Sequence, residues 1–533
     1  MDKNSKIIDK IIYELASQKY ATELDFAKSF RRAFSKHRLA PSTKATLISR
    51  YRQLVKAKKI KATAAFEQLL KKRAVRTLSG VSVITVLSKP FPCPGSCVYC
   101  PTEPKMPKSY LSNEPAAARA KMNLFDAQRQ VTMRIQALEN NGHLVDKLEI
   151  LVLGGTWSVY PKKYQDDFIR DCFYAANTYA KKTKRKKYGL GREQKINETA
   201  KYKIIGLTLE TRPDFITPKE IKNLRRLGAT RIQLGIQHTD DKILKKIKRG
   251  HTVKQSIAAT RLLKEAGFKV DHHYMPDLPG STPQKDLAMF KYVFSSPDLQ
   301  PDQIKIYPCV VNQYAQIYQW YKNKKYKPYT IKQLNNLLLS IKQLVPPYVR
   351  LNRLIRDIPQ NSIIAGNKIT NLRQYLQAEL AKKGRSCQCL RCREIRRSKD
   401  RDMRLVKRQY AASDGQEIFL SFENRNRTRV YAFLRLRFND KNFSPLFPVL
   451  KNSALIRELH VYGQMIPVYQ ENSDDEIGAN QHLGLGKRLM ATAEKIAKKN
   501  GYRKIAVISG IGVRNYYRKL GYKLQDGYLT KSL

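Results

Sequence analysis

The sequence predicts an α/β protein in three parts: a basic helical module, a partial TIM-like barrel of six βα units, and a mixed α/β domain. Three observations indicate this. Residues 1–80 are rich in Lys and Arg, residues 81–307 alternate short β-branched runs with longer helical stretches, and the pattern changes again near residue 385. We expect a helical module over 1–75, a barrel domain over 76–385, a cysteine-rich linker over 386–400 and a last domain over 401–533.

The first module combines positive charge with helical apolar spacing. Residues 1–80 hold 20 Lys and Arg against 6 Asp and Glu, a net charge of +14. Pro41-Ser42 is typical of a new helix start, and the apolar residues before it recur at helical spacing: Ile7, Ile8, Ile11, Ile12 and Leu15. The whole chain carries a net charge of +58. Such an excess repels itself and favours a polyanionic partner, nucleic acid before an acidic membrane surface.

The remaining bulk properties indicate a cytoplasmic protein. No long uncharged apolar run predicts a membrane span, and the N-terminus lacks a signal-peptide pattern. Seven of the eight cysteines fall in ligand-like clusters without disulfide-type spacing, which favours a reducing compartment. The eighth, Cys172, is expected to be an inert buried residue on a helix.

The barrel is predicted from strands that alternate with helical segments, as in a parallel sheet covered on both faces. Its chemistry should lie at the carboxyl ends of the strands. The strand candidates are Val81–Leu87, Leu148–Leu153, Ile204–Leu209, Arg231–Ile236, Lys269–Tyr274 and Gln303–Tyr307.

A cysteine loop directly follows the first of these strands. Cys93, Cys97 and Cys100 have C-x3-C-x2-C spacing. Three thiolates on one loop can hold three irons of a [4Fe-4S] cluster and leave the fourth iron open. An open iron can bind S-adenosylmethionine and pass it an electron, which gives a 5′-deoxyadenosyl radical. The alternative, a structural zinc site, requires a nearby fourth His or Cys. The candidates for that ligand, His143 and Cys172, lie far along the chain.

Polar and glycine residues at other strand ends form the expected cofactor site. Glycine lets backbone approach a ligand closely, and a tight turn is the simpler interpretation of Gly-Gly. We expect a carboxylate and a guanidinium to bind ribose or carboxylate groups, with a surface ion pair as the alternative. The candidates are Gly154, Gly155, Thr156, Glu210, Arg212, Gln237, Lys305 and Tyr307.

A second cysteine group precedes the last domain. Cys387, Cys389 and Cys392 supply three ligands, and Cys309 at the end of the sixth strand is available as a fourth. Four thiolates predict a structural zinc site that joins the barrel to the following domain. A second iron–sulfur cluster and unligated thiols are the alternatives.

The last domain carries an acetyl-CoA motif. Gln481–Leu489 has the pattern Q-x-x-G-x-G-x-x-L at the start of a helix, where free backbone N–H groups can bind a pyrophosphate. With the preceding strand Glu458–Val461 and the later Asn515-Tyr516-Tyr517, this indicates a GNAT acetyltransferase. Tyr517 is the expected general acid for the departing coenzyme A thiolate, while packing of an aromatic pair is the simpler interpretation.

A radical S-adenosylmethionine barrel fused to a GNAT domain resembles the catalytic subunit of the Elongator complex, the tRNA carboxymethyluridine synthase. The resemblance covers most of the chain from about residue 78. The motifs that carry it are the cysteine loop, Gly154–Trp157, Glu210–Asp214, Met275–Pro279, Arg356–Pro359, Arg457–Gly463 and Asn515–Lys519.

The resemblance implies the cofactors and the reaction. Acetyl-CoA would contact Lys147, Glu458, Leu459, His460, Val461, Leu485, Gly486, Lys487 and Tyr517. The deoxyadenosyl radical would take hydrogen from the acetyl methyl group, and the carbon radical would add to C5 of a wobble uridine. Thioester hydrolysis would leave 5-carboxymethyluridine. Among the site residues, Tyr517, Lys147, Glu210 and Tyr307 are the expected catalytic ones. The implied partners are a tRNA anticodon stem-loop and an electron donor for the cluster.

Departures from the common family pattern indicate which members of the family the chain resembles. The short first cysteine gap and the Cys387 group resemble bacterial or archaeal members that act without the larger complex. His238 stands where serine is more usual. A protein lysine acetyltransferase and a non-catalytic RNA-binding scaffold are the alternatives. Neither would need the cysteine loop.

Overall fold

The computed structural model describes residues 3–70, 80–181, 183–395, 402–440, 443–463 and 484–533. The chain divides into two compact units. One comprises Met1–Ser82 with Thr132–Asp146, and the other comprises Val83–Val131 with Lys147–Leu533.

The N-terminal unit is a helical bundle with its own core. Its helices are α1 (Lys3–Ala16), α2 (Glu23–Lys36), α3 (Lys44–Lys56) and α4 (Ala64–Leu70), together with the later turns of α6 (Ala127–Asn140). Thr22 and Asp25 form a capping box on α2, and Thr43 caps α3. The helical prediction is confirmed, because Ile11, Ile12 and Leu15 are buried. Residues 71–75 of the predicted module lie outside the described residues.

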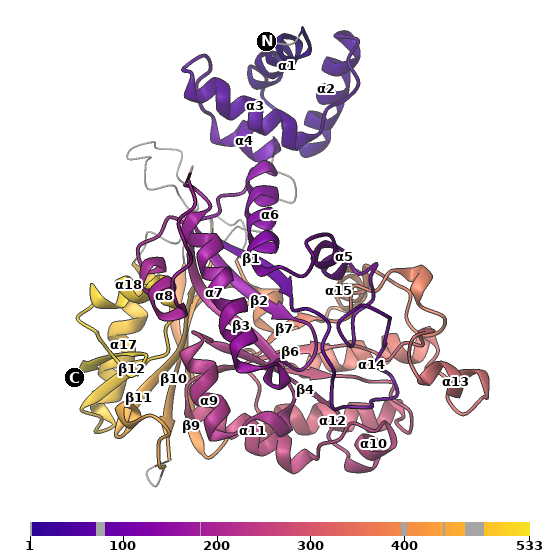
Figure 1. The fold of residues 1–533 in the computed structure, drawn as a ribbon, viewed down its shortest axis with the longest axis vertical. Helices are drawn as coiled ribbons and strands as arrows, with labels where there is room; N and C mark the ends of the chain where they lie inside the picture. The colour runs from indigo at the N-terminus through magenta and orange to yellow at the C-terminus, as the bar shows by residue number, and fades with distance from the viewer. Residues whose placement is uncertain (1–2, 71–79, 182, 396–401, 441–442, 464–483) are drawn as a thin grey trace. The chain divides into compact units, whose positions relative to one another are not determined.

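The barrel is a seven-stranded sheet in the order β1-β2-β3-β4-β5-β6-β7. Figure 1 labels these strands except β5. Pairing from β2 through β7 is parallel throughout. The strands are β1 (Val81–Leu87), β2 (Lys147–Leu153), β3 (Lys203–Thr211), β4 (Arg231–Gln237), β5 (Lys269–Tyr274), β6 (Gln303–Ile306) and β7 (Arg350–Arg353).

The predicted fold class is confirmed, but the strand count is seven rather than six. The additional strand, β7, has the sequence Arg-Leu-Asn-Arg and no β-branched residue. It is a strand because it pairs with β6, which a local pattern cannot show.

Helices accompany the strands of the barrel. In chain order they are α5 (Pro115–Met122), α7 (Lys162–Thr178), α8 (Leu190–Asn197), α9 (Pro218–Arg226), α10 (Asp241–Lys246), α11 (Val253–Glu265), α12 (Pro283–Ser295), α13 (Ile317–Lys322), α14 (Ile331–Leu344) and α15 (Leu372–Lys382). A short helix, α16 (Leu390–Arg393), precedes the last domain.

Alternate positions on the barrel strands are polar as well as buried. On β4, Ile232, Leu234 and Ile236 belong to the apolar core. Between them, the side chain of Gln233 donates to Asp271 at 3.2 Å and accepts from Lys305 Nζ at 2.6 Å. Branched apolar residues usually fill a barrel of this kind. The polar layer therefore indicates that this barrel interior serves a ligand.

The C-terminal domain is a second seven-stranded sheet, in the order β13-β14-β12-β11-β10-β9-β8. Its strands are β8 (Met403–Ala412), β9 (Gly415–Asn424), β10 (Val430–Asn439), β11 (Ser453–Val461), β12 (Lys504–Val507), β13 (Lys523–Gln525) and β14 (Tyr528–Ser532), with helices α17 (Leu485–Lys499) and α18 (Arg514–Arg518). β11 pairs with β12 in parallel only from Ser453 to Ile456, so Glu458–Val461 extend past that pairing.

A buried network of charges joins this domain to the barrel. The Arg457 guanidinium donates to both carboxylate oxygens of Asp302, at 2.9 and 2.5 Å. It also donates to the Phe268 carbonyl at 2.7 Å. Asp302 directly precedes β6 and Phe268 directly precedes β5. The C-terminal domain therefore contacts the amino ends of the barrel strands, whereas the cysteine loop follows the carboxyl end of β1.

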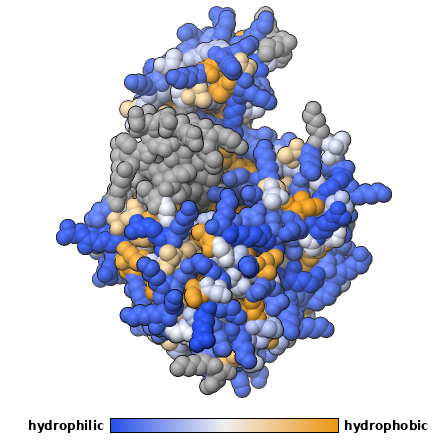
Figure 2. Space-filling view, turned by 90° about the vertical axis from the view of Figure 1, so that its left-hand side faces the viewer, coloured by the Kyte–Doolittle hydropathy of each residue, from blue (hydrophilic) through white to orange (hydrophobic). Residues whose placement is uncertain are grey.

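No helix in the described parts of the chain is long and apolar enough to cross a membrane. On the face drawn in Figure 2, hydrophilic side chains predominate and the hydrophobic residues form small separate patches. This surface agrees with a strongly charged composition.

Candidate active site

The cysteine loop after β1 is held by its backbone. Val98 N donates to the Ile247 carbonyl at 3.1 Å, and the Val98 carbonyl accepts from Ile317 N at 2.7 Å. Cys100 N donates to the Cys97 carbonyl at 3.1 Å. These bonds fix the loop to the residue that ends α10 and to the first residue of α13, so its thiols have defined positions.

The three loop thiols are spread apart. Among the described residues, the one group of at least three potential metal ligands within 4.8 Å of one another is Cys387, Cys389 and Cys392, so Cys93, Cys97 and Cys100 are more widely spaced. A single tetrahedral metal with bonds of about 2.3 Å to sulfur requires closer thiols. The spacing suits a polynuclear cluster.

The loop thiols also have polar neighbours. Cys93 Sγ lies 3.7 Å from Thr156 Oγ1, and Cys97 Sγ accepts from the Arg249 guanidinium at 3.5 Å. Burial, together with the nearby Cys97, raises the pKa of Cys100 to about 12. A bound cationic group would offset that cost, because it would stabilise the thiolate.

The glycines after β2 require their special backbone. Gly154 and Gly155 have φ of +132° and +101°. A Cβ at Gly154 would overlap the Ser88 side chain, so no larger residue fits there. The Gly154 carbonyl accepts from the Tyr160 hydroxyl at 3.1 Å. The Gly154 carbonyl oxygen therefore already accepts one hydrogen bond within the protein.

Glu210 and Arg212 lie where β3 ends. Glu210 accepts from the Tyr110 hydroxyl at 3.1 Å and lies 3.5 Å from His273 Nδ1. Arg212 is bound by Asp214 through two hydrogen bonds of 2.9 and 2.8 Å. Its third nitrogen, NH1, is buried without a hydrogen-bond partner in the described structure. A Cβ at Gly95 would overlap this nitrogen, which places it against the cysteine loop.

Gln237 is the last residue of β4, and Tyr307 directly follows β6. Gln237 has φ of +76°, and its buried side-chain oxygen has no hydrogen-bond partner within the described chain. The rings of Tyr307 and His273 are 5.7 Å apart in an edge-to-face arrangement. Burial raises the pKa of Tyr307 well above its usual range and lowers that of Lys305 to about 8. Both groups can donate hydrogen bonds at neutral pH.

Sequence patterns missed two buried groups in this interior. His273 Nε2 and Asp271 Oδ1 have no hydrogen-bond partner among the residues described. Burial and the nearby Lys305 lower the pKa of His273 well below its usual range, so the ring is neutral. The sequence pattern that could have revealed them is the alternation of the polar residues Lys269, Asp271 and His273 along β5. In the sheet, Asp271 pairs with Gln303 of β6 and His273 with Lys305.

His238 contacts the first turn of α12 instead of the cofactor residues. Its Nε2 lies 3.3 Å from Asp286, and its Nδ1 accepts from Asp240 N at 3.1 Å. These contacts give the histidine a role in holding the segment after β4.

The second cysteine group is assembled from three residues, not four. Cys387, Cys389 and Cys392 come together at α16, while Cys309 is excluded from the group. Cys309 packs instead with Val98, Ile243 and Leu278 in a separate apolar cluster. The four-thiol set expected from the sequence is therefore corrected to three. Cys172 is buried on α7, as predicted.

The acetyl-CoA motif residues lie around the start of α17. Gly484 caps the helix with φ of +66°, and Lys487 is exposed in the first turn. A Cβ at Gly486 would approach the Tyr516 hydroxyl to 2.9 Å. Tyr517 is buried in the domain core, and burial raises the pKa of its hydroxyl well above the usual range. Gln481–Leu483 lie outside the described residues.

Glu458 and His460 are tied to the domain contact. Glu458 accepts from Arg435 at 2.9 Å and lies 3.5 Å from Lys269 Nζ. Burial opposes ionisation, but these two cations lower the pKa of Glu458 to about 2. Burial lowers the pKa of His460 to about 4, so its ring is neutral. Leu459 and Val461 lie near Gly486.

Lys147 begins β2, at the amino end of the barrel strands, where the C-terminal domain also makes contact. It pairs in register with Lys203 of β3. A Cβ at Gly512 of the C-terminal domain would lie 2.7 Å from the Lys203 Cβ. Lys147 therefore lies at the end of the barrel that the C-terminal domain contacts.

In comparisons with known proteins, the barrel and the C-terminal domain match different families. Residues 92–293 match the radical SAM superfamily, residues 301–382 a radical SAM C-terminal domain, and residues 479–522 the acetyltransferase (GNAT) family. The tRNA uridine(34) acetyltransferase of Methanocaldococcus infernus is 42% identical over 87% of this chain and 88% of its own. Human Elongator complex protein 3 is 37% identical over 87% of this chain and 86% of its own.

The chain belongs to the family of tRNA uridine(34) acetyltransferase and Elongator complex protein 3. The solved structure of Methanocaldococcus infernus Elp3 with an N-terminal deletion of residues 1–46 superposes with a TM-score of 0.74 at 39% identity. It covers 86% of this chain and all of that chain. The resemblance inferred from the motifs is thus confirmed.

Membership implies cofactors, and the residues present fit them. A radical SAM domain implies a [4Fe-4S] cluster and S-adenosylmethionine, and a GNAT domain implies acetyl-CoA. The widely spaced thiols suit the cluster, and the buried unpartnered atoms of Arg212 and Gln237 suit a polar cofactor beside it. The group at α16 can bind a further metal ion.

Proposed function

We propose that this chain modifies the wobble uridine of tRNA to 5-carboxymethyluridine. The observation that supports this most directly is that a radical-generating site and an acetyl-CoA site are joined in one compact unit. The names of the relatives, tRNA uridine(34) acetyltransferase and Elongator complex protein 3, agree with this substrate. The net charge of +58 suits an RNA partner.

Each part of the site has a proposed role. When bound, the cluster and S-adenosylmethionine would supply a carbon radical that takes a hydrogen atom from the acetyl methyl group. The acetyl-derived radical would add to C5, and the adduct would then lose the C5 proton and one electron, for which the oxidised cluster would be the acceptor. Water would hydrolyse the thioester and release coenzyme A. Cys93, Cys97 and Cys100 hold the cluster. The Gly154–Thr156 turn, Glu210, Arg212 and Gln237 bind and orient S-adenosylmethionine, and Tyr307 lines the same interior.

In the C-terminal domain, the motif residues bind acetyl-CoA, and one of them supplies a proton to the leaving thiolate. The backbone of Leu485–Lys487 receives the pyrophosphate at the start of α17. Tyr517 keeps its proton at neutral pH and gives it to the departing coenzyme A thiolate. Lys147 and the extension of β11 from Glu458 to Val461 flank the thioester.

The test is nucleoside analysis by mass spectrometry. The reconstituted chain, tRNA, acetyl-CoA, S-adenosylmethionine and a chemical reductant are combined without oxygen. We expect 5-carboxymethyluridine to appear, and to carry label from [2-¹³C]acetyl-CoA. Acetylated protein lysines without any modified nucleoside would instead support a protein acetyltransferase, and binding without turnover would support a scaffold.

Acetyl-CoA hydrolysis is expected to be low in the free chain and to rise when tRNA binds, because an unguarded thioester would be wasted. Tyr517→Phe should reduce the tRNA-stimulated rate about 100-fold, the usual scale for loss of a general acid. Lys147→Ala should lose the stimulation through weaker donor binding. Thiol release measures both.

Tyr516→Phe is the matched control for Tyr517→Phe, since the two rings adjoin at 5.2 Å and only one is assigned the proton. It should keep most of the stimulated rate. Equal losses in both variants would contradict the assignment of Tyr517.

We propose that Cys387, Cys389 and Cys392 bind zinc in a structural role, with the fourth coordination position taken by a water molecule or another small ligand. Leu390 N donates to the barrel carbonyl of Val349 at 3.0 Å, and Ile395 N donates to the Val430 carbonyl at 3.0 Å. A metal at α16 would thus stabilise a segment that touches both domains.

Elemental analysis of purified chain should then give about one zinc per molecule. Cys389→Ser should remove the zinc and lower the melting temperature, while Ser386→Ala, an exposed neighbour, should do neither. Iron in place of zinc would favour a second cluster.

A further inference from the structure

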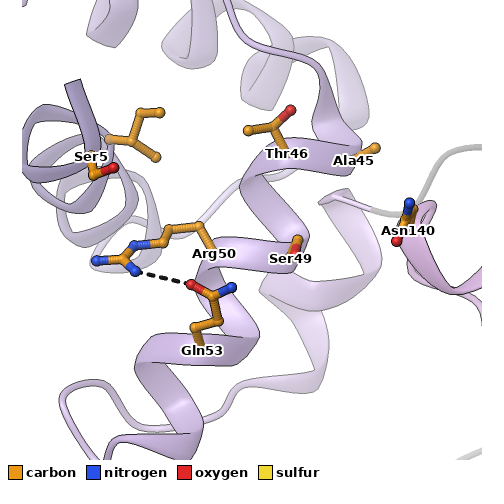
Figure 3. Close-up of a pocket in the computed structure, with 8 residues that line it drawn as sticks. Ser5, Ala45, Thr46, Ser49, Arg50, Gln53 and Asn140 are labelled. Atoms are coloured by element: carbon orange, nitrogen blue, oxygen red, sulfur yellow. Dashed lines mark hydrogen bonds between the residues drawn. The ribbon is translucent and has the colours of Figure 1, made fainter. Parts of the chain in front are cut away.

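The N-terminal unit contains a hollow of about 380 Å³ between α1, α3 and the end of α6 (Figure 3). This volume falls in the range of small-ligand sites, about 300–1,000 Å³. Its polar lining consists of Ser5, Thr46, Ser49, Arg50, Gln53 and Asn140. Ile8 and Ala45 supply apolar surface. We call these eight residues the α1–α3 pocket.

The single charged residue of the pocket lining is already neutralised. The Arg50 guanidinium donates to both carboxylate oxygens of Asp9, at 2.6 and 2.7 Å. Its NH1 donates to Gln53 Oε1 at 2.9 Å, as drawn in Figure 3. The pair fixes a planar guanidinium at the wall without leaving a net charge. A phosphate would gain little there, so the pocket suits a neutral polar ligand.

The remaining polar groups match the edge of a nucleobase. Because Gln53 Oε1 accepts from Arg50, the Nε2 donor of that amide is left for a ligand. Asn140 adds a second amide, and Ser49 a hydroxyl, at exposed positions of the pocket. Amides and hydroxyls recognise base edges, while guanidinium planes and apolar side chains pack on base faces. The surroundings are those of an RNA-binding unit, with a net charge of +14 over residues 1–80.

We propose that the α1–α3 pocket binds one unpaired nucleotide of the tRNA. This inference rests on the proposed tRNA substrate and adds a base contact to the electrostatic attraction of the unit. Phosphate contacts position RNA without reading it, whereas an inserted base gives register. The bound nucleotide would fix which part of the tRNA the N-terminal unit holds.

The experiment measures tRNA affinity of the full chain as a function of salt. Ser49→Trp, which fills the pocket, and the double variant Gln53→Ala with Asn140→Ala should each weaken binding about tenfold, the scale of one lost base contact. The slope of log affinity against log salt should stay unchanged, because no phosphate contact is lost. The matched control is Lys6→Ala, an exposed cation on α1. If that lysine contacts a phosphate, the variant should lower the slope by about one unit.

Three RNAs identify the source of the nucleotide. Intact tRNA, tRNA without its single-stranded 3′ end and an isolated anticodon stem-loop are compared for each variant. The RNA that lacks the inserted nucleotide should bind wild type and pocket variants equally. Melting temperatures of the variants should match wild type, since all three positions are exposed.

Two results would overturn the inference. Pocket variants that bind every RNA as wild type does would exclude a base contact. A tenfold loss accompanied by a smaller salt slope would show a phosphate site instead. In either case wobble modification by the wild-type chain could persist, so the proposed function would stand. A wild-type chain that binds no tRNA would overturn both proposals.

Discussion

Replacing Cys93, Cys97 and Cys100 together with alanine is expected to abolish iron binding, the brown chromophore and cleavage of S-adenosylmethionine. The physical reason is that these thiols supply the three protein ligands of the proposed cluster. In the described chain their Sγ atoms do not all lie within 4.8 Å of one another, and no fourth ligand completes such a group with them. Iron content, visible absorbance and 5′-deoxyadenosine formation after anaerobic reconstitution measure the effect.

The control for this loss is Cys172→Ala. That cysteine is buried on α7 and has no assigned ligand role, so iron content should remain at the wild-type value. The cluster variant should also keep tRNA-stimulated hydrolysis of acetyl-CoA while making no modified uridine. Iron that survives the triple substitution would disprove the ligand assignment. Loss of hydrolysis with tRNA still bound would show that the two half-reactions are not separable.

Local patterns predicted much of the fold because they report short-range physics. β2 and β4 were found from β-branched and apolar residues, and the cysteine loop and the Gly154-Gly155 turn from residue types with few other uses. β7 escaped because its four residues have no strand propensity of their own. Pairing with β6 makes it a strand, and that register depends on the whole sheet.

Within the site, too, local patterns predicted some features, while others depend on the folded structure. Glu210, Arg212 and Gln237 could be placed at strand ends, since carboxyl ends of parallel strands share one edge of the sheet. The pairing of Arg212 with Asp214 depends on side-chain geometry that spacing does not encode. Cys309 was grouped with distant thiols by residue type alone, although its strand end packs against Val98 and Leu278.

Asp302→Asn is expected to cause the largest loss of stability among the variants that keep every proposed ligand. Asp302 is fully buried between the barrel and the C-terminal domain. It pairs with Arg457 at 2.5 Å and with Lys264 at 3.6 Å, and it accepts from Val270 N at 2.9 Å. The amide would leave these cations short of one counter-charge. Removing one member of a buried ion pair costs about 3–5 kcal/mol.

The exposed pair of Arg261 and Asp414 provides the control. These side chains lie 2.9 Å apart and are 47% and 61% exposed. Asp414→Asn should therefore cost about 0–1 kcal/mol, because water screens the lost interaction. Chemical denaturation of both variants at neutral pH compares them. Equal effects would show that the buried network adds no more than a surface pair.

The same carboxylate predicts how stability depends on pH. Burial alone would raise the pKa of Asp302, but Arg457, Lys264 and Arg435 hold it well below the usual range. A carboxyl whose folded pKa is depressed stabilises the fold fully above its unfolded pKa, about 3.9. That contribution is lost as pH falls from there through the folded pKa. Wild type should thus lose more stability than Asp302→Asn between about pH 5 and pH 3, since only wild type must protonate this carboxylate. Parallel acid unfolding curves would show that other groups govern the transition.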